Sequence, residues 1–120
     1  MPWMIAAAGM FLLVSVTPAE ADPGERLAAA CFDGMARNDE RINGRTCRCF
    51  ARHVAANIDA SMMPVVEAAL RRKVVRAMTL GARLPRVKRD RLLALYRNAV
   101  PRWKALCIAR TTAIAAAIAQ

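Results

Sequence analysis

The chain has 120 residues, which is the length of one small domain and too short for two. Its 19 basic residues outweigh nine acidic ones and give a formal net charge of +10, an excess that favours anionic partners. A domain of this size buries only about 60 to 70% of the surface that its unfolded chain exposes, so covalent cross-links would support a thin core.

Residues 1–21 are typical of a signal peptide. An almost unbroken apolar run over residues 3–16 precedes Ala19-Glu20-Ala21, a small-x-small triplet of the kind that signal peptidase cleaves after. The pattern departs from the usual one because no Lys or Arg precedes Arg26. The run is too short to cross a hydrocarbon core, which takes about 20 residues. We therefore expect cleavage after Ala21 and a single helical domain over residues 22–120, located in the periplasm or secreted.

Four cysteines in an exported chain predict two disulfides, formed by Cys31, Cys47, Cys49 and Cys107. A bond between Cys47 and Cys49 would strain a tiny ring, so we exclude that pairing. Two pairings remain open. Because residues i and i+2 of a helix point about 200° apart, Cys47 and Cys49 address different neighbours, and we favour Cys31 with Cys47 and Cys49 with Cys107.

The first helix of the mature chain is predicted from Pro23 to Gly34. Asp22 is a suitable N-cap, proline is accepted in a first turn, and Gly34 is expected to stop the helix in the left-handed conformation. The polar stretch 35–45 is predicted to be a loop that turns the chain back.

Two helices are predicted in the middle of the chain. Thr46 is expected to cap the first of them, which runs to about Ala60. The second starts near Pro64, which a first turn tolerates, and runs to about Leu80. The apolar face of this helix is expected to comprise Val66, Leu70, Val74 and Met78.

From Arg86 onward an apolar stripe keeps helical spacing. It comprises Leu92, Tyr96, Val100, Trp103, Cys107 and Ile114. Pro101 interrupts the helix because it lacks a donor and clashes with the preceding turn, so we expect a kink or two helices that meet end to end. The alanine-rich stretch 112–119 suits packing against another helix. The sequence thus predicts an all-α fold, a small disulfide-stapled bundle of four or five helices after a signal peptide.

Basic residues crowd into one part of the chain. Residues 71–104 contain twelve of them against the single acid Asp90. One interpretation is a set of solvated helix faces in an arginine-rich chain. The other is a docking surface for anions, because the planar guanidinium makes paired hydrogen bonds to phosphate or carboxylate. The expected anion-binding residues are Arg71, Arg72, Lys73, Arg76, Arg86, Lys88 and Arg89.

Signals for catalysis, cofactors and metals are weak. The one histidine and the scattered acids form no acid–base pair, and no glycine-rich phosphate loop is present. Cys49 and His53 share a helix face and, with Cys47 and Cys31, would make a soft set for zinc or cuprous copper. Both this metal hypothesis and a redox role for the cysteine pair are minor. We therefore expect no enzyme activity, no cofactor and no metal ligand.

These observations predict a small exported helical protein that acts by binding, as an accessory or interaction module of the cell envelope. The expected partner is an anionic envelope component, either lipid head groups or an acidic protein. The alternative is a cytoplasmic or nucleoid-associated nucleic-acid-binding protein whose N-terminal apolar run is a buried helix. We find no helix-turn-helix pattern with a glycine at its turn that would favour this alternative.

Processing provides the first test. Protein recovered from its native cell should begin at Asp22, because the apolar run and the small-x-small triplet direct cleavage after Ala21. N-terminal sequencing of fractionated cells measures this directly. An intact Met1 in cytoplasmic material would contradict export.

Overall fold

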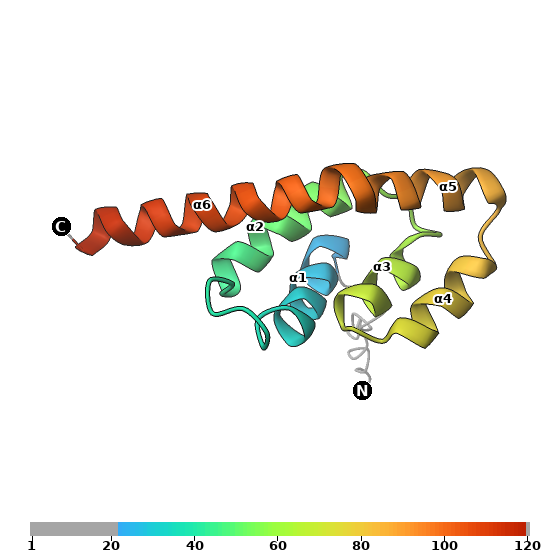
Figure 1. The fold of residues 1–120 in the computed structure, drawn as a ribbon, viewed down its shortest axis with the longest axis horizontal. Coiled ribbons are helices and arrows are strands. Elements are labelled where there is room, and N and C mark those ends of the chain that lie inside the picture. Colours follow the sequence, from blue (N-terminus) through green and yellow to red (C-terminus); the bar gives the residue numbers. More distant parts are fainter. Residues whose placement is uncertain (1–21, 120) are drawn as a thin grey trace, which may run out of the picture.

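The computed structural model describes residues 22–119, which form helices and connecting turns without a strand (Figure 1). The predicted signal peptide lies outside the described residues. The helices are α1 Pro23–Gly34, α2 Gly44–Ala55, α3 Met63–Leu70, α4 Val74–Ala82, α5 Arg86–Ala94, the π-helical turn η2 Leu95–Ala99, and α6 Val100–Ala119. Because α5, η2 and α6 follow one another without a break, they form one long helix, and the described chain contains five helical rods. The predicted all-α, disulfide-stapled bundle is confirmed.

Two disulfides hold α2 at the centre of the molecule. Cys31 of α1 bonds Cys47, with Cα atoms 5.6 Å apart, and Cys49 bonds Cys107 of α6, with Cα atoms 5.7 Å apart. The favoured pairing is therefore confirmed. Phe50 projects from α2 into the core and is 2% exposed. A single turn of α2 thus joins α1 on one side and α6 on the other.

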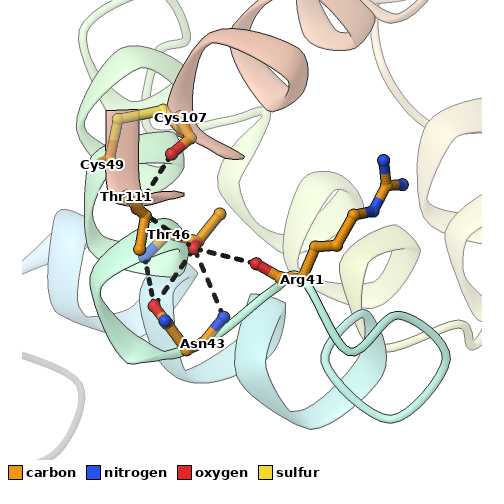
Figure 2. The surroundings of a disulfide bond; sticks show 6 residues. All are labelled: Arg41, Asn43, Thr46, Cys49, Cys107 and Thr111. Carbon is orange, nitrogen blue, oxygen red and sulfur yellow. Dashed lines mark hydrogen bonds between the residues drawn. A yellow bond between two sulfur atoms is a disulfide. The ribbon is translucent and has the colours of Figure 1, made fainter. Parts of the chain in front are cut away.

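The start of α2 differs from the prediction by one turn. Asn43 is the N-cap, and Thr46 occupies the third helical position of a capping box, so the assignment of Thr46 as N-cap is wrong. The Thr46 hydroxyl is buried and lies 3.3 Å from the Thr111 hydroxyl of α6, which donates to the Cys107 carbonyl at 2.9 Å (Figure 2). Thr46 therefore links α2 to α6 as well as closing the cap.

The middle of α2 is as predicted, but its end is not. It stops at Ala55 instead of Ala60. The Asn57 side chain donates to the His53 carbonyl at 2.8 Å, and this bond replaces the next helical hydrogen bond. Asp59 then accepts from the backbone N–H of Ser61 at 2.9 Å and starts the turn that leads into α3.

The single helix predicted from Pro64 to Leu80 is two helices, α3 and α4. The chain leaves α3 through Arg72, whose φ of 66° is left-handed. The N–H groups of Arg72 and Lys73 return to the carbonyls of Ala69 and Ala68 at 3.1 and 2.9 Å, which is a Schellman ending. Glycine is the usual residue at such a position, so the sequence carried no signal for this break.

Division of this helix changes the predicted apolar face. Val66 and Leu70 are buried as expected, but Val74 and Met78 are 63% and 69% exposed. Helix α4 has no buried residue. The prediction is therefore right for α3 and wrong for α4, because α4 departs in a new direction after Arg72.

A π-helical turn precedes Pro101. The Val100 N–H reaches back to the Leu95 carbonyl, so the helix widens for one turn and then continues into α6. Such turns occur where the regular hydrogen-bond ladder is interrupted. The expected kink or end-to-end junction is thus a local widening within one continuous helix.

The end of α6 projects past the other helices (Figure 1). Residues 112–119 are all exposed, so within the described chain this alanine-rich stretch does not pack against another helix, contrary to expectation. Ile114, predicted to belong to the buried stripe, is 39% exposed. Of the described helices, none is both long enough and apolar enough to cross a membrane.

Gly34 permits α1 to meet the end of α3, and its replacement is a sharp test of the fold. A Cβ at this position would lie 1.8 Å from the Leu70 carbonyl oxygen. We expect Gly34→Ala to lower the free energy of unfolding by about 2 kcal/mol or more, because backbone atoms must move. Thermal unfolding should show this loss, whereas the control Gly44→Ala, whose Cβ would meet only the flexible Arg48 side chain at 3.4 Å, should be neutral or stabilising.

Tyr96 lies in the π-helical turn, and its hydroxyl is buried without a hydrogen-bond partner among residues 22–119. Burial raises the pKa of Tyr96 to about 12. Because a buried hydroxyl without a partner costs about 1 to 3 kcal/mol, Tyr96→Phe should leave stability unchanged or raise it by about 1 kcal/mol. Denaturant unfolding measures the difference. A loss of more than about 1 kcal/mol would show that the hydroxyl has a stabilising partner.

Candidate functional site

The predicted basic segment is divided by the structure into paired and unpaired residues. Arg71 lies 3.2 Å from Asp33 and 3.9 Å from Glu67, and Glu67 also accepts from Arg26 at 2.7 Å. This network joins α1 to α3 and is partly buried. The charge of Arg71 is thus compensated within the protein, and its main contribution is to the packing of these two helices.

The three residues of the set that lie on α5 have partners as well. Lys88 Nζ lies 3.2 Å from Asp59 and 2.9 Å from the Ser61 hydroxyl, so it holds α5 against the turn before α3. Hydrogen bonds from Ser61 and the nearby Lys88 ammonium lower the pKa of Asp59. Arg86 lies 3.9 Å from Asp90 on the surface, and Arg89 donates to the Leu84 carbonyl at 3.1 Å.

Arg72, Lys73 and Arg76 are the remaining members of the predicted set. All three are exposed, and none forms an ion pair with the residues that the structure describes. Lys73 and Arg76, with Arg26 and Arg71, line a shallow hollow of about 510 Å³ beside Pro64. The uncompensated charge of the predicted site is therefore concentrated at the start of α4.

Exposed apolar side chains accompany this charge. Val74, Val75 and Met78 are 63%, 78% and 69% exposed, and Val87 at the start of α5 is 75% exposed. At 100° per residue the three α4 side chains share one face, whereas the partly buried Leu80 lies on the opposite side. Arg76 lies on the side of Leu80 and, with Lys73, borders the hollow beside Pro64, so α4 has an apolar face and a basic side turned away from it.

A second basic site, which the sequence analysis missed, lies between α2 and α6. Arg45, Arg48 and Arg52 of α2 and Arg110 of α6 line a cleft of about 710 Å³. The remaining lining residues are Cys49, His53, Ala56, Thr111 and Ile114. The available signal was the spacing of the three α2 arginines, which puts them on one helix face. The denser basic run after residue 70 obscured it.

No acidic side chain lines this cleft, and five carboxylates of the described chain form ion pairs elsewhere. Those in ion pairs are Asp33, Asp39, Asp59, Glu67 and Asp90. Among them, Asp39 accepts two side-chain hydrogen bonds from Arg41, which lower its pKa to about 2. Of the other acids, Asp22 and Glu25 lie beside two of these arginines. They line a separate hollow beside Arg48 and Arg52 without an ion pair to either.

The structure groups Cys49 and His53 with Cys107, whereas the metal hypothesis grouped them with Cys47 and Cys31. Cys49, His53 and Cys107 have potential ligand atoms within 4.8 Å of one another. Both cysteine sulfurs are joined in a disulfide, however, and Cys31 and Cys47 are joined in the other. A disulfide sulfur is not the thiolate that zinc or cuprous copper needs. The His53 ring stacks on Trp103, with ring centroids 5.8 Å apart.

Comparison of the chain with protein-family models, curated proteins and solved structures gives no significant match.

Proposed function

We propose that this is a small exported protein that binds an anionic lipid surface through α4 and the first turn of α5. The observation that carries the proposal is the division of α4 into an exposed apolar face, formed by Val74, Val75 and Met78, and a basic side that carries Lys73 and Arg76. Residues 71–89 contain no acid. A helix that presents apolar and basic side chains together is suited to the interface between lipid head groups and acyl chains.

Both components of this surface have a role in the proposal. The exposed apolar side chains would leave water on insertion, with a gain of about 25 cal/mol for each Å² removed. Each Lys or Arg near an anionic membrane adds about 1 kcal/mol. A nucleic acid or a purely acidic peptide would use the cations but not the valines. The combination therefore favours a membrane surface over these two partners.

The left-handed backbone conformation of Arg72 supports a functional role for its side chain. Its φ of 66° is unfavourable for any residue with a side chain, and glycine would remove that cost. Strained residues of this kind occur preferentially at functional sites.

The two disulfides support the proposed location. Bonds of this kind persist in oxidising compartments outside the cytoplasm. A periplasmic or secreted protein meets the anionic head groups of the envelope directly. The proposed location and the proposed partner are therefore consistent with each other.

Vesicle binding tests this function. The protein should bind vesicles containing phosphatidylglycerol in low salt and should not bind pure phosphatidylcholine vesicles. Substitution of Arg72, Lys73 and Arg76 by Gln should weaken binding by about 100-fold, since about 1 kcal/mol is lost for each charge. Arg71 is left intact because its ion pairs stabilise α1 and α3. Co-sedimentation over a lipid titration gives the affinities.

Two further variants separate a site from a general effect of charge. Substitution of Arg91, Arg97 and Arg102 by Gln removes the same charge elsewhere on the long helix and should have a much smaller effect. Val75→Ser with Met78→Ser keeps all charges and should also weaken binding. Equal losses from both triple substitutions, or no binding to anionic vesicles at low salt, would refute the proposal.

A further inference from the structure

We infer that the cleft between α2 and α6 is a binding site for a ligand that carries two phosphate groups. This site is separate from the proposed membrane-binding face of α4. Its four arginines come from two helices that the Cys49–Cys107 disulfide joins directly. The cleft volume of about 710 Å³ falls in the range typical of small-molecule sites.

The spacing of the α2 arginines directs them into the cleft. Arg45, Arg48 and Arg52 are separated by three and four residues, so they follow one another along a single face of α2. Cys49 lies on the same face, and its disulfide attaches α6 beside the arginines. Arg110 is three residues beyond Cys107 and closes the cleft from the α6 side.

The arrangement is unfavourable for the helix itself. Like charges three or four residues apart destabilise a helix by about 0.2 to 0.5 kcal/mol for each pair. Arg45 also lies in the first turn, where the helix dipole disfavours a cation. Helix α2 contains no acid to offset these effects, and the four arginines make no ion pair with any described residue. A bound anion would relieve this repulsion.

The number of charges selects the ligand. A phosphate monoester carries a charge of about −1.5 to −2 at neutral pH, so two such groups balance four guanidinium groups. The planar guanidinium donates paired hydrogen bonds to phosphate oxygens. Ile114 and Ala56 also line the cleft and offer apolar contact to the part of the ligand that is not charged.

The walls of the cleft up to Thr111 are fixed before a ligand arrives. The Cys49–Cys107 disulfide and the Thr46–Thr111 hydrogen bond both connect α2 to α6 at this point (Figure 2). A pre-organised site loses less conformational entropy on binding than one that must be assembled. The arginine side chains are exposed, so ligands reach them without a change in the fold.

Pyrophosphate is the probe for the test, with orthophosphate as the single-phosphate comparison. Calorimetry of the disulfide-bonded mature protein in low salt should show one pyrophosphate site, bound at least tenfold more tightly than orthophosphate. Arg48→Gln with Arg52→Gln should weaken pyrophosphate binding by tenfold or more, because hydrogen bonds to charged groups are lost. Without ligand, the same variant should keep its helical content and its melting temperature, since repulsion within α2 is relieved.

The matched control is Lys73→Gln with Arg76→Gln, which removes equal charge from the α4 face. This variant should retain pyrophosphate binding while losing affinity for anionic vesicles, so the two sites can fail independently. Farnesyl diphosphate in phosphatidylcholine vesicles tests whether the diphosphate belongs to a lipid. A higher affinity than for pyrophosphate would indicate a lipid ligand, and a lower affinity would indicate a free diphosphate. Absence of pyrophosphate binding at low salt, or equal losses from both double variants, would overturn the proposal.

Discussion

The fold depends on the two disulfides that leave α2 in different directions. Cys47 and Cys49 are two residues apart, yet one bonds α1 and the other bonds the long helix. In a helix this spacing turns the two side chains about 200° from each other. The described chain has a small core, so burial of apolar surface offsets little of the conformational entropy lost on folding. The disulfides reduce that loss because they close loops in the unfolded chain. Removal of α2 would separate α1 from α6.

Helix α2 also carries three of the four arginines of the cleft, on the side away from the core. The side of α2 that carries Phe50 and Cys47 is buried, whereas the side that carries Arg45, Arg48 and Arg52 is solvated and repels itself. The buried side and the covalent bonds can tolerate that repulsion. A helix of this composition would be marginal in isolation, because helices of about 12 residues rarely form in water without tertiary support. The covalent framework therefore permits a concentration of charge that helix propensity alone would not.

The predictable parts of the fold are those that depend on local chemistry. Asp22 and Pro23 mark the start of α1 correctly, and the spacing of Cys47 and Cys49 correctly predicts that they bond different helices. The left-handed stop expected at Gly34 is wrong, because no described glycine has a positive φ and Gly34 is the last residue of α1. The errors arise where tertiary contacts decide. The start of α2 is an exception, because Asn43 is the N-cap of a local capping box in which Thr46 holds the third helical position. Arg72 ends a helix in a conformation that its side chain disfavours, which no local pattern signals.

The candidate sites were only partly accessible from sequence for the same reason. The density of cations after residue 70 is visible in the sequence, but the ion pairs that neutralise Arg71 and Lys88 join residues distant along the chain. The cleft requires α2 and α6 to lie side by side. Residue spacing could have shown that three α2 arginines share a face. It could not have shown that Arg110 lies across from them.

The exposed end of α6 implies that this helix has two regions of very different local stability. Up to Thr111 the backbone is anchored by Cys107 and by buried contacts, so its amides should open only with the whole domain. Beyond Thr111 the alanine-rich turns have no tertiary support and rely on intrinsic helix propensity. Their opening free energy should decline toward zero along residues 112–119, and that part of the helix should lengthen or shorten with temperature. Ile114, which borders the arginine cleft, lies at the start of this gradient.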